Sequence, residues 1–144
     1  MDKPPSPRLP SILVVDDNDV TRMVTKWFLA NFGYQAQCAR SAEEGLALFD
    51  PKTHDLVITD NSMPGMSGIQ MARDIKMLSP STPILMYTLD PPDDASDVDL
   101  VIRRPAHLLE LKDAVDQLLA IHVPGQIRPA PPNPTDQPKA GPGL

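Results

Sequence analysis

Residues 12–18 read ILVVDDN, a short apolar run that leads directly into two aspartates. A continuous β-branched run of this length is typical of a strand buried on both faces, as in a parallel sheet. The segment from Asp19 to Gly33 then carries apolar residues at three- and four-residue spacing, which predicts a helix. Those residues are Val20, Met23, Val24, Trp27, Phe28 and Phe32, and Trp27 is expected in the core or on a partly buried helix face. A buried strand followed at once by a helix indicates an α/β domain.

The alternation of strands and helices continues along the chain. Further strands are predicted at residues 34–39, 56–59, 83–88 and 100–102, and further helices at 41–49, 67–78 and 106–121. Ser41 precedes two glutamates and is expected to cap the second helix. Parallel strands joined by right-handed helical crossovers predict a flavodoxin-like, doubly wound sheet of five strands with helices on both faces.

Composition separates a core from two tails. The chain has 144 residues, 41% of them hydrophobic, and its 18 prolines crowd towards both ends. A proline-rich segment with almost no large apolar side chain cannot bury enough surface to offset its ordering entropy. We therefore expect a flexible segment at residues 1–9, one folded domain at 10–123 and a disordered tail at 124–144.

Charge and cysteine content exclude several classes of protein. The formal net charge of -6 disfavours binding to nucleic acid or to an anionic membrane surface. Cys38 is the only cysteine, so no internal disulfide can form. No apolar run resembles a signal peptide or reaches the roughly 18 residues of a membrane span. A cytoplasmic protein is expected.

Polar residues follow the predicted strands at their carboxyl ends, where open parallel sheets bind ligands. They are Asp16, Asp17, Asp60, Thr88 and Arg104. Three clustered carboxylates repel one another unless a cation neutralises them, and oxygen ligands suit Mg²⁺ or Mn²⁺. A carboxylate beside such an ion can attack phosphorus, while the hydroxyl and the guanidinium bind the phosphoryl oxygens. The pattern predicts a phosphoryl-transfer site.

The sequence resembles the receiver domain of two-component response regulators from about Ile12 to Leu119. The resemblance is carried by ILVVDDN at 12–18, DLVITDNSMPGMSG at 55–68, ILMYT at 84–88 and the pair Arg104-Pro105. It implies a CheY-like version of the α/β fold. It also implies a protein that is phosphorylated by a histidine kinase or a phosphotransfer protein and signals to a downstream protein that the sequence does not identify.

The resemblance assigns roles to individual residues. Asp60 becomes the phosphoacceptor, and Asp16 and Asp17 become metal ligands together with Asp60 and the backbone carbonyl of Ser62. Thr88 becomes the switch hydroxyl, with Arg104 as the cation that contacts the phosphoryl group. The bond before Pro105 is implied to be cis, as it commonly is in the family.

The sequence departs from the family pattern in ways that bear on signalling. Arg104 stands where the family has lysine, Leu89 follows Thr88 where a small residue is usual, and Val101 replaces the usual aromatic. Residues 89–99, with two prolines and five aspartates, are too few for a full helix plus its connections. The family's fourth helix is therefore expected to be shortened or replaced by a mobile acidic loop, and the output to be atypical.

Several functions remain open on the sequence alone. The first hypothesis is a stand-alone receiver that is phosphorylated on Asp60 and does not turn over an external substrate. The alternative is a pseudo-receiver, a protein-interaction scaffold that works without phosphorylation. A Mg²⁺-dependent phosphohydrolase is disfavoured because Ser62 stands where such enzymes place a second catalytic aspartate. A flavodoxin-like cofactor binder is disfavoured because no glycine- or hydroxyl-rich loop follows the first strand.

Overall fold

A computed structural model describes residues 9–122, in which five strands alternate with four helices. The strands are β1 (Ser11–Val15), β2 (Gln35–Ala39), β3 (Leu56–Thr59), β4 (Ile84–Thr88) and β5 (Leu100–Arg103). The helices are α1 (Asp19–Asn31), α2 (Ala42–Leu48), α3 (Gly68–Leu78) and α4 (Leu108–His122). The strands are paired in parallel in the order β2-β1-β3-β4-β5, which confirms the predicted sheet. The tail predicted at 124–144, and all but the last residue of the segment predicted at 1–9, lie outside the described residues.

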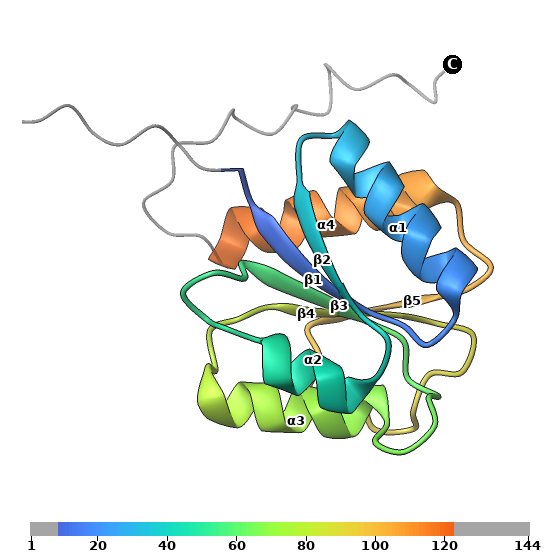
Figure 1. Ribbon diagram of the computed structural model, residues 1–144, viewed down its shortest axis with the longest axis vertical. Coiled ribbons are helices and arrows are strands. Elements are labelled where there is room, and N and C mark those ends of the chain that lie inside the picture. The colour runs from blue at the N-terminus through green and yellow to red at the C-terminus, as the bar shows by residue number, and fades with distance from the viewer. Residues whose placement is uncertain (1–8, 123–144) are drawn as a thin grey trace, which may run out of the picture.

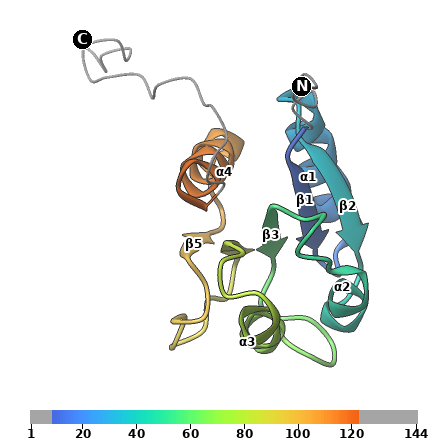
Figure 2. The same ribbon diagram turned by 90° about the vertical axis from the view of Figure 1, so that its left-hand side faces the viewer.

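The helices cover both faces of the sheet (Figure 1; Figure 2). Alternate residues of a strand point to opposite faces, so Ile12 and Val14 pack in one core cluster and Leu13 and Val15 in the other. The first cluster includes residues of α1 and α4, and the second includes residues of α2 and α3. Burial on both faces explains why the central strands are continuous apolar runs.

Three helices begin at side chains that accept a backbone hydrogen bond from the first turn. Asn18 Oδ1 accepts from Thr21 N at 2.9 Å at the start of α1. Ser41 Oγ accepts from Glu44 N at 3.0 Å, which confirms the predicted cap of α2. Ser67 forms a full capping box with Gln70 at the start of α3. None of the helices in the described part of the chain is both long and apolar enough to cross a membrane.

The apolar stripe of α1 points away from the sheet. Val20, Met23 and Trp27 are 70%, 68% and 72% exposed, whereas Thr25 and Leu29 are buried. The expected burial of Trp27 is therefore wrong. The three- and four-residue spacing correctly predicted the helix, but it did not predict which face of the helix packs on the sheet. That face carries the two buried residues, Thr25 and Leu29, which lie one turn apart.

The connection between β4 and β5 contains no helix, which agrees with the prediction that this helix is shortened or replaced by a loop. Three of its five aspartates contact residues outside the connection. Asp90 Oδ2 accepts from Ser62 Oγ at 2.6 Å, and Asp99 Oδ2 lies 2.7 Å from Lys76 Nζ on α3. Asp97 is also paired with α3, through Arg73. The mobility expected for this loop stays a prediction.

Candidate functional site

Three carboxylates meet at the carboxyl ends of β1 and β3. The two strands are neighbours, with Val15 opposite Thr59, so the residues that follow them lie side by side. One carboxylate oxygen from each of Asp16, Asp17 and Asp60 lies within 4.8 Å of the others. The predicted acidic cluster is thus present.

Asp16 is the most buried member of this cluster. Its burial raises its pKa to about 6, from 3.8, and the neighbouring charges of Asp60 and Asp17 act in the same direction. The Asn18 backbone N–H, which donates to Asp16 Oδ1 at 2.8 Å, and the charge of Arg104 lower the pKa in part. Three carboxylates this close to one another, one of them buried, fit a hard divalent cation, which would offset both the repulsion and the burial of the Asp16 charge.

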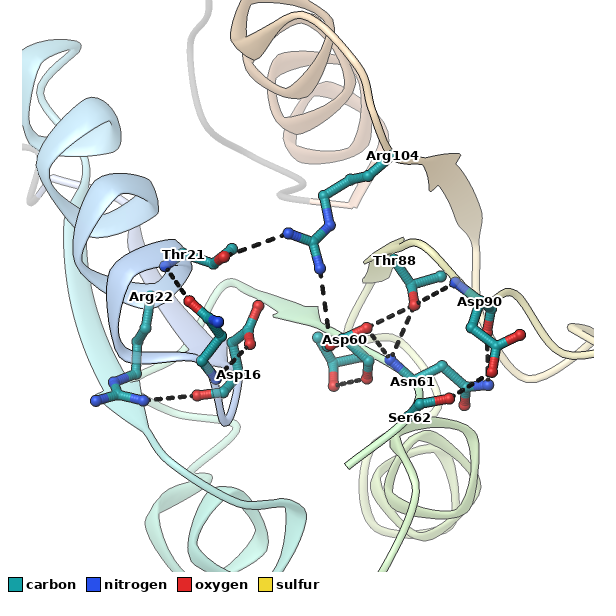
Figure 3. Close-up of polar contacts among 11 residues, drawn as sticks. Asp16, Thr21, Arg22, Asp60, Asn61, Ser62, Thr88, Asp90 and Arg104 are labelled. Atoms are coloured by element: carbon teal, nitrogen blue, oxygen red, sulfur yellow. Dashed lines mark hydrogen bonds and ion pairs between the residues drawn. The ribbon is translucent and has the colours of Figure 1, made fainter. Parts of the chain in front are cut away.

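Asp60, at the end of β3, accepts two hydrogen bonds through one carboxylate oxygen. Its Oδ1 atom accepts hydrogen bonds from the Thr88 hydroxyl at 2.5 Å and from the Asn61 backbone N–H at 2.7 Å (Figure 3). Thr88 is fully buried at the end of β4, beside the end of β3. The Thr88 oxygen also accepts from the Asp90 backbone N–H at 3.1 Å, so one hydroxyl joins Asp60 to the start of the β4–β5 connection.

Arg104 approaches Asp60 from the end of β5. Its Nη2 atom lies 3.8 Å from Asp60 Oδ2, and its Nη1 atom donates to Thr21 Oγ1 on α1 at 3.3 Å (Figure 3). The guanidinium carbon lies 5.2 Å from the centre of the Tyr87 ring. The bond between Arg104 and Pro105 is cis, as the resemblance implied.

Ser62 lies beside this cluster with its side chain turned to the β4–β5 connection, where it bonds Asp90. The role expected of its backbone carbonyl as a metal ligand stays a prediction. Leu89, expected to restrict access to the site, is 61% exposed and follows Thr88 directly.

The structure adds contacts that the sequence did not predict. Asn61 accepts from Ile69 N through its side-chain oxygen and donates to the Asp90 carbonyl, so it links three segments. Thr21 reaches Arg104 across 83 positions of the chain. The position of Thr21 could have indicated this contact, because Thr21 is a polar residue in the first turn of α1 and that turn begins at the same edge of the sheet as the acidic cluster.

Comparison with known sequences and structures assigns the family. Residues 12–107 match the family model described as the response regulator receiver domain. The chain belongs to this family. The fold is accordingly the CheY-like α/β fold, here with five parallel strands and four helices in the described residues. The chain is therefore grouped with domains that kinases phosphorylate and not with enzymes that turn over a substrate, so the phosphohydrolase hypothesis is set aside.

Individual relatives cover different shares of the chain. A segment of 76 residues is 36% identical to the autoinducer 1 sensor kinase/phosphatase LuxN of Vibrio campbellii, and it spans 53% of this chain but only 9% of LuxN. A receiver domain protein of Methanospirillum hungatei superposes with a TM-score of 0.75 at 26% identity, covering 80% of this chain and 97% of that one.

The response regulator TrrA of Thermotoga maritima, solved in complex with Mg²⁺-BeF, superposes with a TM-score of 0.72 at 33% identity over 76% of this receiver and 99% of TrrA. TrrA has also been solved in complex with the histidine kinase ThkA. A receiver of the same family thus binds Mg²⁺-BeF and a histidine kinase.

Proposed function

We propose that this receiver accepts a phosphoryl group on Asp60 from a histidine kinase or a phosphotransfer protein and signals through protein contacts. The observation that carries the proposal is the placement of the Asp60 carboxylate. It lies within the acidic cluster, accepts a hydrogen bond from Thr88 and faces the guanidinium of Arg104. The cytoplasmic location expected from the sequence remains a prediction.

The groups around Asp60 account for the part that this chain's own residues play in the transfer. A carboxylate oxygen of Asp60 attacks phosphorus and forms an O–P bond, while the bond from phosphorus to the donor nitrogen breaks. The electron pair of the broken bond stays on the donor imidazole, which takes up a proton from solvent. The Thr88 hydroxyl and Arg104, which now contact the two oxygens of Asp60, are within reach of the transferred phosphoryl oxygens.

The acidic cluster fits a divalent cation. Asp16, Asp17 and Asp60 would hold Mg²⁺ or Mn²⁺, with the Ser62 backbone carbonyl as a further ligand. When bound, such an ion neutralises the carboxylates and the charge of the phosphoryl oxygens. The raised pKa of Asp16 supports this assignment, because an unneutralised carboxylate is unfavourable in its buried position.

A protein partner is supported by the surface beside the site. The exposed apolar residues of α1 begin at Val20, one residue before Thr21, whose hydroxyl contacts Arg104. Exposed apolar side chains that recur at helical spacing fit a contact surface for another protein. The relative TrrA, solved with a histidine kinase, supports a kinase as the phosphodonor.

The pseudo-receiver is the second candidate. It is favoured by the missing helix between β4 and β5 and by Arg104, one end of which is engaged with Thr21. In this alternative the fold presents an interaction surface and Asp60 is never modified.

Intact-protein mass spectrometry distinguishes the two candidates. The parent, Asp60→Asn and the control Asp93→Asn, which alters an exposed loop aspartate, are incubated with Mg²⁺ and acetyl phosphate. Our proposal expects one added phosphoryl group in the parent and the control and none in Asp60→Asn. Addition to Asp60→Asn would contradict the assignment of the residue. No addition to the parent, either from acetyl phosphate or from a phosphorylated histidine kinase, would favour the pseudo-receiver.

A further inference from the structure

The guanidinium of Arg104 has one nitrogen that is hydrogen-bonded to a side chain, Nη1, and one buried nitrogen that is not, Nε. Nη1 donates to Thr21 Oγ1 at 3.3 Å, and Nη2 lies 3.8 Å from Asp60 Oδ2. Nε is buried and has no hydrogen-bond partner among the described residues. In a guanidinium the Nε and Nη2 hydrogens lie on the same edge, so the edge that includes the atom nearest Asp60 is also the one with a free donor.

This arrangement matters because arginine and lysine present their charge differently. An ammonium donates in any direction, whereas the planar fork of arginine binds phosphate well only when one of its edges is aligned with two oxygens. The guanidinium carbon lies 5.2 Å from the centre of the Tyr87 ring, and the attraction between cation and ring favours placement of the guanidinium over that ring. Rotation within that plane is limited at Nη1 by the Thr21 hydroxyl.

We propose that Thr21 is a positioning residue, which holds Nη1 of Arg104 so that the Nε–Nη2 edge faces Asp60 and binds two oxygens of the phosphoryl group there. The inference rests on the proposed phosphoacceptor role of Asp60. It explains how arginine fills the lysine position of the family, since the required orientation comes from α1. It also explains the buried Nε donor, which a phosphoryl oxygen would satisfy.

The Thr21 hydroxyl can be removed without removing the helix start. The backbone N–H of Thr21 bonds the capping side chain of Asn18, while the hydroxyl bonds Arg104. Thr21→Val keeps the β-branched shape and the backbone N–H but loses the hydroxyl. Thr21→Ser keeps the hydroxyl and is the conservative control.

The first experiment follows phosphorylation by acetyl phosphate and Mg²⁺ over time by intact-protein mass spectrometry. Thr21→Val is expected to lower the rate constant about tenfold, the effect of misplacing one charge-assisted contact, and Thr21→Ser to restore most of it. In an Arg104→Lys background, Thr21→Val is expected to have no further effect, because an ammonium has no edge to align. Equal losses in both backgrounds, or no loss in either, would overturn the inference.

The second experiment does not depend on phosphorylation. The Nε–H resonance of Arg104 is assigned by NMR, and its exchange with water is compared in the parent, Thr21→Val and Thr21→Ser. Positioning by Thr21 predicts slow exchange in the parent and in Thr21→Ser and faster exchange in Thr21→Val. Unchanged exchange in Thr21→Val would overturn the inference even in a protein that is phosphorylated normally. A parent that takes no phosphoryl group from either donor but shows the expected exchange pattern would instead refute the proposed function.

Discussion

The charged form of the Asp16 carboxylate lowers the stability of the folded state, and the same carboxylate is suited to bind a cation. It is 4% exposed, and its carboxyl lies beside two others. Its pKa is raised from 3.8 to about 6, so the folded state binds this proton more tightly than the unfolded state does. The contribution of Asp16 to stability is therefore most favourable below about pH 4 and is lost as the pH rises through about 6.

Asp16→Asn is expected to stabilise the protein when no divalent cation is present. At about pH 8 the parent carries a buried charge that the amide lacks, so the variant should be more stable by about 2 kcal/mol. At about pH 4 the two should unfold alike, because Asp16 is then protonated in the folded state. Thermal unfolding in the presence of a chelator measures both differences.

Added Mg²⁺ supplies the control for this prediction. It should raise the unfolding temperature of the parent more than that of Asp16→Asn, since the variant has lost a charged ligand. A variant less stable than the parent at the higher pH, with the chelator present, would show that burial of Asp16 carries no net electrostatic cost.

Lys76, on α3, joins that helix to the segments on either side of β4. Its Nζ atom donates to the Thr82 carbonyl at 2.8 Å and lies 2.7 Å from Asp99 Oδ2. The same carboxylate oxygen accepts from the Ile84 backbone N–H at 2.7 Å. These contacts hold the helix-free connection against α3, which replaces part of the packing that a helix between β4 and β5 would supply.

Lys76→Met is expected to destabilise the domain by about 1 to 2 kcal/mol, because it leaves a carbonyl and a carboxylate without their shared donor. Arg73→Met is the matched control. It removes the more exposed ion pair with Asp97 and should cost less than about 0.5 kcal/mol. Urea unfolding of the three proteins measures the difference. Equal losses of unfolding free energy in the two variants would mean that the contacts of Lys76 with Thr82 and Asp99 do not stabilise the β4–β5 connection more than an exposed ion pair does.

At the scale of the whole domain, the described residues 9–122 form two core clusters, one on each face of the sheet, from residues between Ile12 and Leu119. A chain that stops after Val123 is therefore expected to keep the stability of the full chain and its phosphorylation on Asp60. A chain that stops after Ala114 should fail to fold, because it loses Val115, Leu118 and Leu119 from the core. Circular dichroism and acetyl phosphate labelling of both truncations provide the measurement. A large loss of stability in the longer truncation would show that the proline-rich segment contributes to the folded domain.

Much of this architecture could be predicted from local sequence. The strands and helices were recognisable because each carries its own signal, such as the ILVV run of β1 or the Ser41 cap of α2. The proximity of Asp16, Asp60 and Thr88 could also be predicted, because each follows or ends a parallel strand. The carboxyl ends of parallel strands lie at the same edge of the sheet, so the strand order alone places these residues close together.

Other features were decided only by the tertiary structure. The side of α1 that faces the sheet depends on how the whole helix seats on it, and its apolar stripe faces outward. The contact between Thr21 and Arg104 and the ties of the β4–β5 connection join side chains from distant segments. Local periodicity and strand order determine which elements form and in what order they lie. The direction and reach of individual side chains across the gaps between elements depend on packing in three dimensions, which the sequence pattern does not record.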